Sequence, residues 1–132
     1  MVEKKIEVFF PGGMKVNADV EGIIVKSDQA VKNGGEGSAA EPFQLFMVSI
    51  ATCAGVYALD FCNARQIPPQ DMTLTMQCEF DPVAVRCQKI SLDLKLPQGF
   101  PEKYKKAIIR VMDLCSVKKN ILEPPEFYIT AN

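Results

Sequence analysis

A long apolar segment in the first half of the chain restricts its possible folds more than any other feature. The segment PFQLFMVSIATCAGVYALDFCNARQ runs from Pro42 to about Gln66 and is followed by Pro68-Pro69. It predicts a helix of about 25 residues, roughly 38 Å long, that the two prolines stop. Almost every position from 45 to 61 is apolar or small. Such a helix is either buried on most sides or spans a membrane.

Polar residues at both ends of this segment favour burial. Glu41 and Gln44 precede its apolar interior, and Asp60, Asn63 and Arg65 follow it. The interior that remains is about 15 residues long, shorter than the roughly 20 that a membrane span needs. We therefore expect the helix to lie between a sheet and a second subunit, and to begin with a capping box formed by Ser38 and Glu41.

Charge and the amino terminus exclude several partners. Fifteen basic and sixteen acidic side chains leave a formal charge of -1 without long runs, so neither nucleic acid nor a membrane surface is an expected partner. The apolar stretch at residues 6–10 is too short for a signal peptide. These observations predict a cytoplasmic protein.

Short runs with strand character flank the long helix. Three of them precede it and are separated by glycine-containing turns, which predicts an antiparallel meander. Two follow it and alternate apolar with polar residues, so each has one buried face. The five runs are residues 4–10, 15–20, 22–26, 72–80 and 90–96. Between the meander and the helix, the polar, glycine-rich residues 28–40 predict a surface loop of the kind that often borders a site.

The last third of the chain predicts a further helix and a closing strand. A helix from Pro101 would place Tyr104, Ile108, Val111 and Cys115 on one apolar stripe. Residues 126–130 would form a short strand. With 132 residues and 48% apolar side chains, the whole chain is expected to be a single α+β domain, with an antiparallel sheet around a long central helix.

The cysteines and the absence of histidine narrow the chemistry. The chain has five cysteines, without a CxxC or zinc-like spacing, and no histidine. No metal, no cofactor and no histidine-dependent hydrolase is therefore expected. The odd number argues against a secreted disulfide framework and predicts reduced thiols that include at most one reactive pair. The cysteines are Cys53, Cys62, Cys78, Cys87 and Cys115.

Two of the cysteines carry a resemblance to a known family. Pro42, the small-residue apolar run and Cys53 eleven residues later resemble the OsmC/Ohr (osmotically inducible protein C-like) superfamily, as does the segment Cys115-Ser116-Val117-Lys118. The order of the elements is also similar over essentially the whole length. The resemblance implies an intertwined homodimer in which Cys53 attacks an organic or inorganic hydroperoxide and Cys115 resolves the product. A dithiol reductant would then restore the pair.

The chain departs from the best-known peroxidases of that family at two positions. Where they carry an arginine in the first hairpin, this chain has Met14, and Lys15 is the nearest cation. Where they carry a glutamate on the central helix, it has Phe43. The segments Cys53-Ala54-Gly55 and Ala64-Arg65-Gln66-Ile67 resemble a less characterised OsmC-like branch. Met14 and Phe43 leave open a small-molecule binding or sulfur-handling protein with little peroxidase activity. A structural protein with inert thiols is a third alternative.

Four further residues are candidates for a supporting role beside the two cysteines. Glu41 and Gln44 are the nearest polar substitutes for the missing glutamate, and Tyr57 follows Cys53 by one helical turn and can donate to a thiolate. With Lys15, they are the candidate supporting residues.

The other cysteines are expected to be structural or exposed. Cys62 would lie opposite Cys53 on the helix and pack in the core. Cys78 falls on the buried face of its strand, and Cys87 falls in the turn at residues 81–88.

Overall fold

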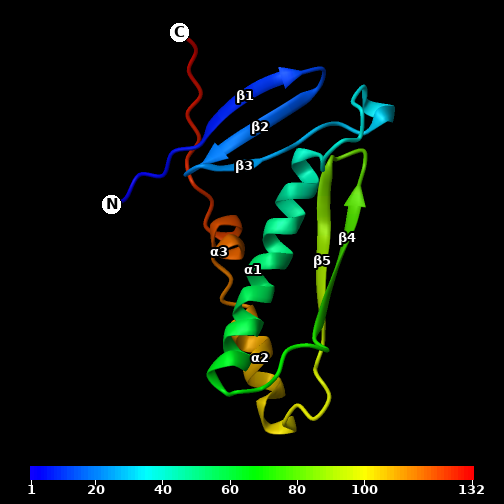
Figure 1. The fold of residues 1–132 in the computed structure, drawn as a ribbon, viewed down its shortest axis with the longest axis vertical. Helices are drawn as coiled ribbons and strands as arrows, with labels where there is room; N and C mark the ends of the chain where they lie inside the picture. Colours follow the sequence, from blue (N-terminus) through cyan, green and yellow to red (C-terminus); the bar gives the residue numbers. More distant parts are fainter. The chain divides into compact units, whose positions relative to one another are not determined.

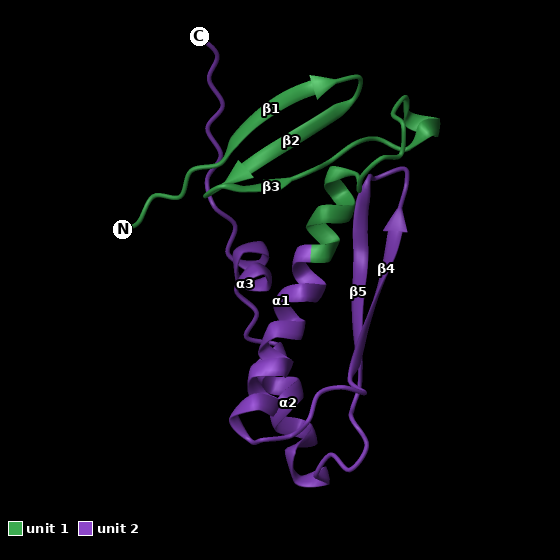
Figure 2. Cartoon of the chain, viewed as in Figure 1, with its two compact units in different colours: residues 1–48 green, residues 49–132 purple.

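A computed structural model describes residues 1–132 as two compact units, residues 1–48 and residues 49–132 (Figure 2). Each unit is described by itself. The elements, coloured along the chain in Figure 1, are β1 (Glu7–Gly12), β2 (Lys15–Val20), β3 (Ile23–Val25), the 3-10 turn η1 (Val31–Asn33), α1 (Pro42–Ala64), β4 (Thr73–Asp81), β5 (Arg86–Lys95), η2 (Glu102–Tyr104), α2 (Lys105–Met112) and α3 (Ser116–Leu122). The long helix α1 begins in the first unit and ends in the second.

The first unit contains the predicted meander. Its three strands pair antiparallel in the order β1-β2-β3, with Glu7 opposite Asp19 and Ala18 opposite Val25. The β1–β2 turn passes through Gly13 at φ +57°, a left-handed conformation that glycine adopts without steric cost. The strand and turn expectations for this part of the chain are confirmed.

A buried carboxylate organises the glycine-rich loop of the first unit. Asp28 is 1% exposed and accepts hydrogen bonds from the Ser38 hydroxyl at 2.6 Å and from the backbone N–H groups of Gln29, Glu36 and Ser38. The Ser38 hydroxyl, followed by its backbone N–H, lowers the pKa of Asp28 to about 2. The loop also requires glycine at position 35, where a Cβ would lie 2.0 Å from the Gln29 carbonyl oxygen. Polar composition predicted the loop but not this carboxylate.

The start of α1 corrects the predicted capping box. The Glu41 carbonyl accepts the first helical bond from Leu45, so Glu41 rather than Ser38 is the residue that precedes the helix. Gln44 reaches back and accepts from the Glu41 backbone N–H at 2.9 Å, which is one half of a capping box. Ser38 is not available for the cap because it bonds Asp28.

The second unit contains the predicted strand pair. β4 and β5 form an antiparallel hairpin from Thr73 opposite Lys95 to Asp81 opposite Arg86. Alternate residues of β4 are half-buried and exposed up to Glu79, as the alternating sequence requires.

Helices α1 and α2 form the core of the second unit. Ala58, Phe61 and Cys62 of α1 cluster with Ile108 of α2. Leu94 of β5 packs against this cluster, together with other partly buried apolar side chains. Cys62 is fully buried, and burial raises the pKa of its thiol. Its predicted packing role is confirmed.

Helix α1 is less enclosed than the sequence predicted. Val56 is 62% exposed and Leu59 is 41% exposed, so an apolar part of the helix is uncovered in the single chain. By length and composition alone α1 could cross a membrane, a property that the core helices of soluble proteins share.

Two expectations for the last third of the chain are wrong. The helix predicted from Pro101 through Cys115 ends at Met112, and Cys115 lies in the junction before α3. Residues 126–130 do not form a strand, and Phe127 and Ile129 are more than four-fifths exposed. A strand needs a neighbour to satisfy its backbone groups, and the local pattern does not reveal whether one is present in the same chain.

Candidate active site

The fold brings two distant cysteines of the second unit together. Cys53 lies in the middle of α1, and Cys115 is the residue that precedes α3. The Cys115 thiol is hydrogen-bonded to the Cys53 sulfur, and the Ser116 hydroxyl lies 3.6 Å from the same sulfur. Both cysteines are free thiols in this structure. These are the two residues that the family resemblance singled out.

Hydrogen bonds from the α3 junction favour the thiolate form of Cys53. The thiol of Cys115 contributes most, followed by the backbone N–H of Val117, and together with Ser116 they lower the pKa of Cys53 to about 7. Burial acts in the opposite direction and is outweighed. The backbone groups belong to the first turn of α3, where N–H groups have no partner within the helix. Cys53 is therefore ionised at neutral pH to a greater extent than an ordinary cysteine.

Cys115 has the opposite character. Its side chain is 3% exposed, and burial, followed by its hydrogen bond with Cys53, raises the pKa of its thiol. Cys115 therefore stays protonated while it donates to the Cys53 thiolate. Cys115 precedes α3 and does not continue α2. The apolar helical stripe that the sequence predicted therefore ends at Met112, three residues before Cys115.

An apolar cavity of about 890 Å³ reaches Cys115 within the second unit. Apolar side chains of α1, β5 and α2 form much of its wall, among them Ile50, Leu92 and Ile108. Lys106 and Arg110 of α2 also line it and have no acidic partner within ion-pair distance. The cavity can accommodate an apolar molecule next to Cys115.

The candidate supporting residues have other contacts. In the first unit, Lys15 pairs with Glu36 at 2.8 Å, while the Glu41 carboxylate accepts from Asn33 and Gln44 caps α1. In the second unit, Tyr57 is half-buried and is not among the groups that shift the pKa of Cys53. A role for these four residues stays a prediction.

Sequence reasoning named Cys115 but missed the other two residues that lower the pKa of Cys53. Ser116 and the backbone of Val117 act because a new helix starts at Ser116. Serine shortly after a cysteine is a weak signal, and the start of α3 could have been inferred only by recognising that α2 ends at Met112.

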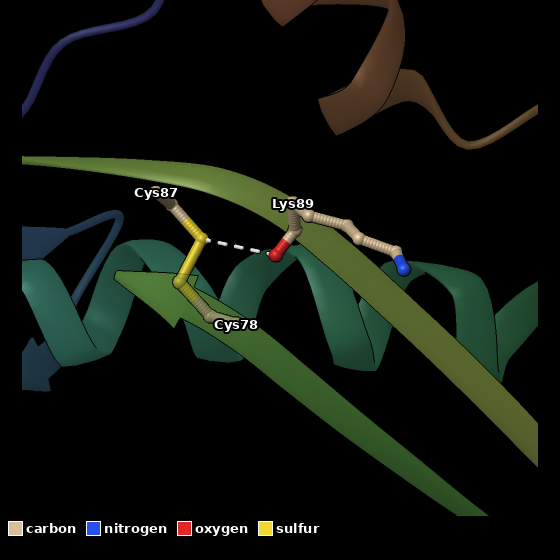
Figure 3. The surroundings of a disulfide bond; sticks show 3 residues. All are labelled: Cys78, Cys87 and Lys89. Atoms are coloured by element: carbon tan, nitrogen blue, oxygen red, sulfur yellow. Dashed lines mark hydrogen bonds between the residues drawn. A yellow bond between two sulfur atoms is a disulfide. The ribbon is translucent and has the colours of Figure 1, made fainter. Parts of the chain in front are cut away.

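The remaining two cysteines correct the expectation of reduced thiols. Cys78 and Cys87 form a disulfide between β4 and β5, with their Cα atoms 6.0 Å apart (Figure 3). Cys87 is the second residue of β5 and does not lie in the turn. The sequence placed Cys78 on the half-buried face correctly, but it did not indicate that Cys87 reaches the same face. The structure contains no group of three or more His, Cys, Asp and Glu residues that could hold a metal ion.

Comparisons with known proteins agree with this architecture. The family model for OsmC-like proteins matches residues 35–130. The chain therefore belongs to the OsmC-like family, and this membership indicates a soluble protein. A search of curated protein sequences found no match.

Solved structures share the fold at low sequence identity. A protein of Psychrobacter arcticus 273-4, provisionally described as an osmotic stress induced and detoxification response protein, has a TM-score of 0.77 at 19% identity, over 91% of this chain and 89% of its own. An OsmC-like protein of Mycoplasma pneumoniae has a TM-score of 0.72 at 13% identity, over 93% and 89%. An organic hydroperoxide resistance protein OsmC of Legionella pneumophila, described as a predicted redox protein, has a TM-score of 0.58 at 19% identity, over 92% and 90%. These similarities support the α+β fold with antiparallel sheets and a long helix.

Proposed function

We propose that this protein is a thiol-dependent peroxidase in which Cys53 attacks a hydroperoxide and Cys115 resolves the oxidised product. One observation supports the proposal most directly. Cys53 has a pKa of about 7 and is hydrogen-bonded to a second, protonated cysteine. A thiolate is the nucleophilic form of cysteine, and a neighbouring thiol can trap the product of its oxidation.

The first step consumes one hydroperoxide. The Cys53 thiolate attacks the terminal oxygen of ROOH, an S–O bond forms and the O–O bond breaks. The leaving RO⁻ takes a proton and departs as the alcohol ROH. Cys53 is then a sulfenic acid, which a second peroxide would oxidise further unless a thiol reacts first.

The second step uses the cysteine that already contacts Cys53. The Cys115 sulfur attacks the sulfenic sulfur, an S–S bond forms, and the hydroxyl leaves as water with the Cys115 proton. A dithiol reductant then donates two electrons and returns both thiols. Cys115 is buried and protonated in the resting state, which is consistent with a resolving rather than an attacking role.

The cavity favours organic over inorganic hydroperoxides within this proposal. Its wall contains Cys115 and is mostly apolar, so an alkyl or aryl group gains contact area there that hydrogen peroxide cannot gain. The same cavity is the observation that favours the second candidate, a small-molecule binding or sulfur-handling protein with little peroxidase activity. Met14 and Phe43 stand at the two family positions where the best-known peroxidases carry charged residues, which also suits that candidate.

The proposal includes a homodimer of single-domain chains in the cytoplasm. Exposed apolar side chains support the dimer, among them Val56 on α1 and Phe127 and Ile129 near the carboxyl end. The family match to residues 35–130 crosses the boundary between the two units at residue 48, which supports one domain over residues 1–132. Sedimentation equilibrium of the full chain tests the dimer, because a monomer at all concentrations would exclude it.

Peroxide consumption tests the function. Purified protein is mixed with a dithiol reductant and with cumene hydroperoxide, tert-butyl hydroperoxide or hydrogen peroxide in parallel. We expect catalytic consumption of the two organic peroxides, with cumene hydroperoxide consumed fastest. Equal consumption by wild type, Cys53→Ser and Cys115→Ser would exclude the peroxidase. Saturable binding of cumyl alcohol without turnover would instead support the binding protein.

A further inference from the structure

The Cys78–Cys87 bridge differs from a simple staple, because the hairpin that it joins is already paired along its length. Nine residue pairs connect β4 and β5, from Thr73 and Lys95 to Asp81 and Arg86. Both cysteines are half-buried rather than enclosed in the core. The bond is therefore not needed to bring the two strands together.

A β-bulge makes this bridge possible. Glu79 pairs with Lys89, but Phe80 pairs with Cys87, so Gln88 is an extra residue on β5. Successive side chains of a strand point to opposite faces. If Gln88 instead paired with Phe80 in a regular register, Cys87 would stand opposite Asp81, on the face away from Cys78. The bulge moves Cys87 onto the face of Cys78.

The tip of the hairpin holds a strained residue. Val85 has φ +53°, a left-handed conformation that is sterically costly for a β-branched side chain. The Asp81 carboxylate accepts hydrogen bonds from the backbone N–H groups of Val83 and Ala84 and from the Gln88 side chain. Together with the bridge, these bonds hold the tip and its bulge in place.

Each sulfur also has a defined neighbour. Cys87 Sγ lies 3.6 Å from the Lys89 carbonyl oxygen (Figure 3), which can accept a hydrogen bond from the thiol once the bridge is open. Cys78 stands directly across from Ile90, and Ile90 lines the cavity that reaches Cys115. The bridge thus adjoins one wall of that cavity.

We propose that Cys78 and Cys87 form a second, reversible thiol–disulfide exchange site, which locks the bulged hairpin tip when oxidised and releases it when reduced by a small dithiol. This site is separate from Cys53 and Cys115 and does not rest on the proposed peroxidase. A thiolate of the dithiol attacks one sulfur, the Cys78–Cys87 bond breaks and a mixed disulfide forms. The second thiol of the reagent closes its own disulfide. Two electrons and two protons reach the protein, and both cysteines become thiols.

The first experiment isolates the bridge with a full-length Cys53→Ser, Cys115→Ser variant, whose only other cysteine is Cys62. Alkylation followed by peptide mass spectrometry counts the free thiols in native buffer. Because Cys62 is fully buried, we expect no alkylated thiol after oxidation and two, Cys78 and Cys87, after dithiothreitol, with return to none on addition of oxidised dithiothreitol. A bridge that opens only in denaturant is a permanent staple and would overturn the proposal, as would a pair that never bonds.

Hydrogen exchange in the same variant tests the lock. Backbone amides of residues 81–90 should exchange at least about fivefold faster in the reduced form, while those of α1 stay unchanged. Equal exchange of the hairpin tip in both redox states would contradict the proposal.

Insertion of one residue between Glu79 and Phe80 tests the role of the bulge. The inserted residue pairs with Gln88 and restores a regular register, which places Phe80 and Cys87 on the face away from Cys78, so the bridge should not form. Gln88→Ala is the matched control, because it removes the hydrogen bond to Asp81 but keeps the extra residue, and it should still form the bridge. A bridge that forms equally in both variants would refute the geometric argument.

Discussion

The two cysteine pairs of this chain share one structural unit but depend on different parts of it. Cys53 and Cys115 are 62 residues apart and meet where α3 begins beside α1. Cys78 and Cys87 are nine residues apart in one hairpin and are already bonded. The first pair is polarised, since one thiol is stabilised as a thiolate and the other as a neutral donor. The comparison shows that a hydrogen bond from one thiol to another, with backbone N–H groups beside it, stabilises a thiolate, whereas the two sulfurs in the hairpin are joined by a bond and do not titrate.

Replacement of Cys53 should distinguish the functions of the two cysteine pairs most clearly. With Cys53→Ser, catalytic consumption of cumene hydroperoxide should fall at least about 1,000-fold, because a serine hydroxyl is not ionised at neutral pH. A coupled dithiol assay measures the rate. The double variant Cys78→Ser, Cys87→Ser is the control and should keep most of the activity. The functional assignment of the two pairs would be reversed if this control lost activity and Cys53→Ser kept it.

Removal of the Cys115 thiol should change both the fate and the pKa of Cys53. In Cys115→Ala the sulfenic acid formed by the first equivalent of peroxide has no partner thiol, so a second equivalent of peroxide oxidises it to sulfinic acid and is reduced to the alcohol. The pKa of Cys53 should also rise from about 7 toward the ordinary thiol value, because its largest stabilising contact is lost. Mass spectrometry identifies the oxidised species.

The pH dependence of alkylation measures that pKa shift. In wild-type protein, the iodoacetamide rate at Cys53 should increase with pH through a midpoint of about 7 and level off above it, since the thiolate is the reacting form. In Cys115→Ala the midpoint should lie at higher pH, so the rate at pH 7 decreases. An unchanged midpoint would mean that the Cys115 thiol does not stabilise the thiolate.

Loss of the Ser116 hydroxyl should have a smaller effect of the same sign. Ser116→Ala removes one contact 3.6 Å from the Cys53 sulfur but leaves the backbone N–H groups and the Cys115 thiol in place. The alkylation midpoint should rise by less than in Cys115→Ala. Ser116→Thr, which retains a hydroxyl, is the control and should keep a midpoint near that of wild type. A larger shift for Ser116→Ala than for Cys115→Ala would reverse this order.

Relief of strain at the hairpin tip should be the smallest effect. Val85→Gly should increase the free energy of unfolding by about 0.5–1 kcal/mol, because glycine adopts φ +53° without the steric cost that valine incurs. Val83→Gly in the same turn is the matched control. It should be neutral or destabilising, since Val83 is not in the left-handed region. Urea denaturation of the oxidised proteins measures both differences, and a stabilised control would refute the strain argument.

Local patterns in the sequence determined much of this protein. Three local patterns predict the strands and the long helix: the glycine turns of the meander, the alternation in β4 and β5, and the apolar run that ends before Pro68-Pro69. They do so because strand and helix periods depend on neighbours only a few residues away. The cysteine in the middle of the apolar helix and the later cysteine also identified the family, which the match to residues 35–130 bears out.

The tertiary structure alone decided how each sulfur behaves. Three features change the local position of the chain by about one turn or one residue. They are the end of α2 at Met112, the start of α3 at Ser116 and the bulge at Gln88. Shifts of that size change which face a side chain occupies and which N–H groups surround it. The pKa of Cys53 and the pairing of Cys87 follow from these shifts, because a thiol responds to groups within a few ångströms, whatever their separation along the sequence.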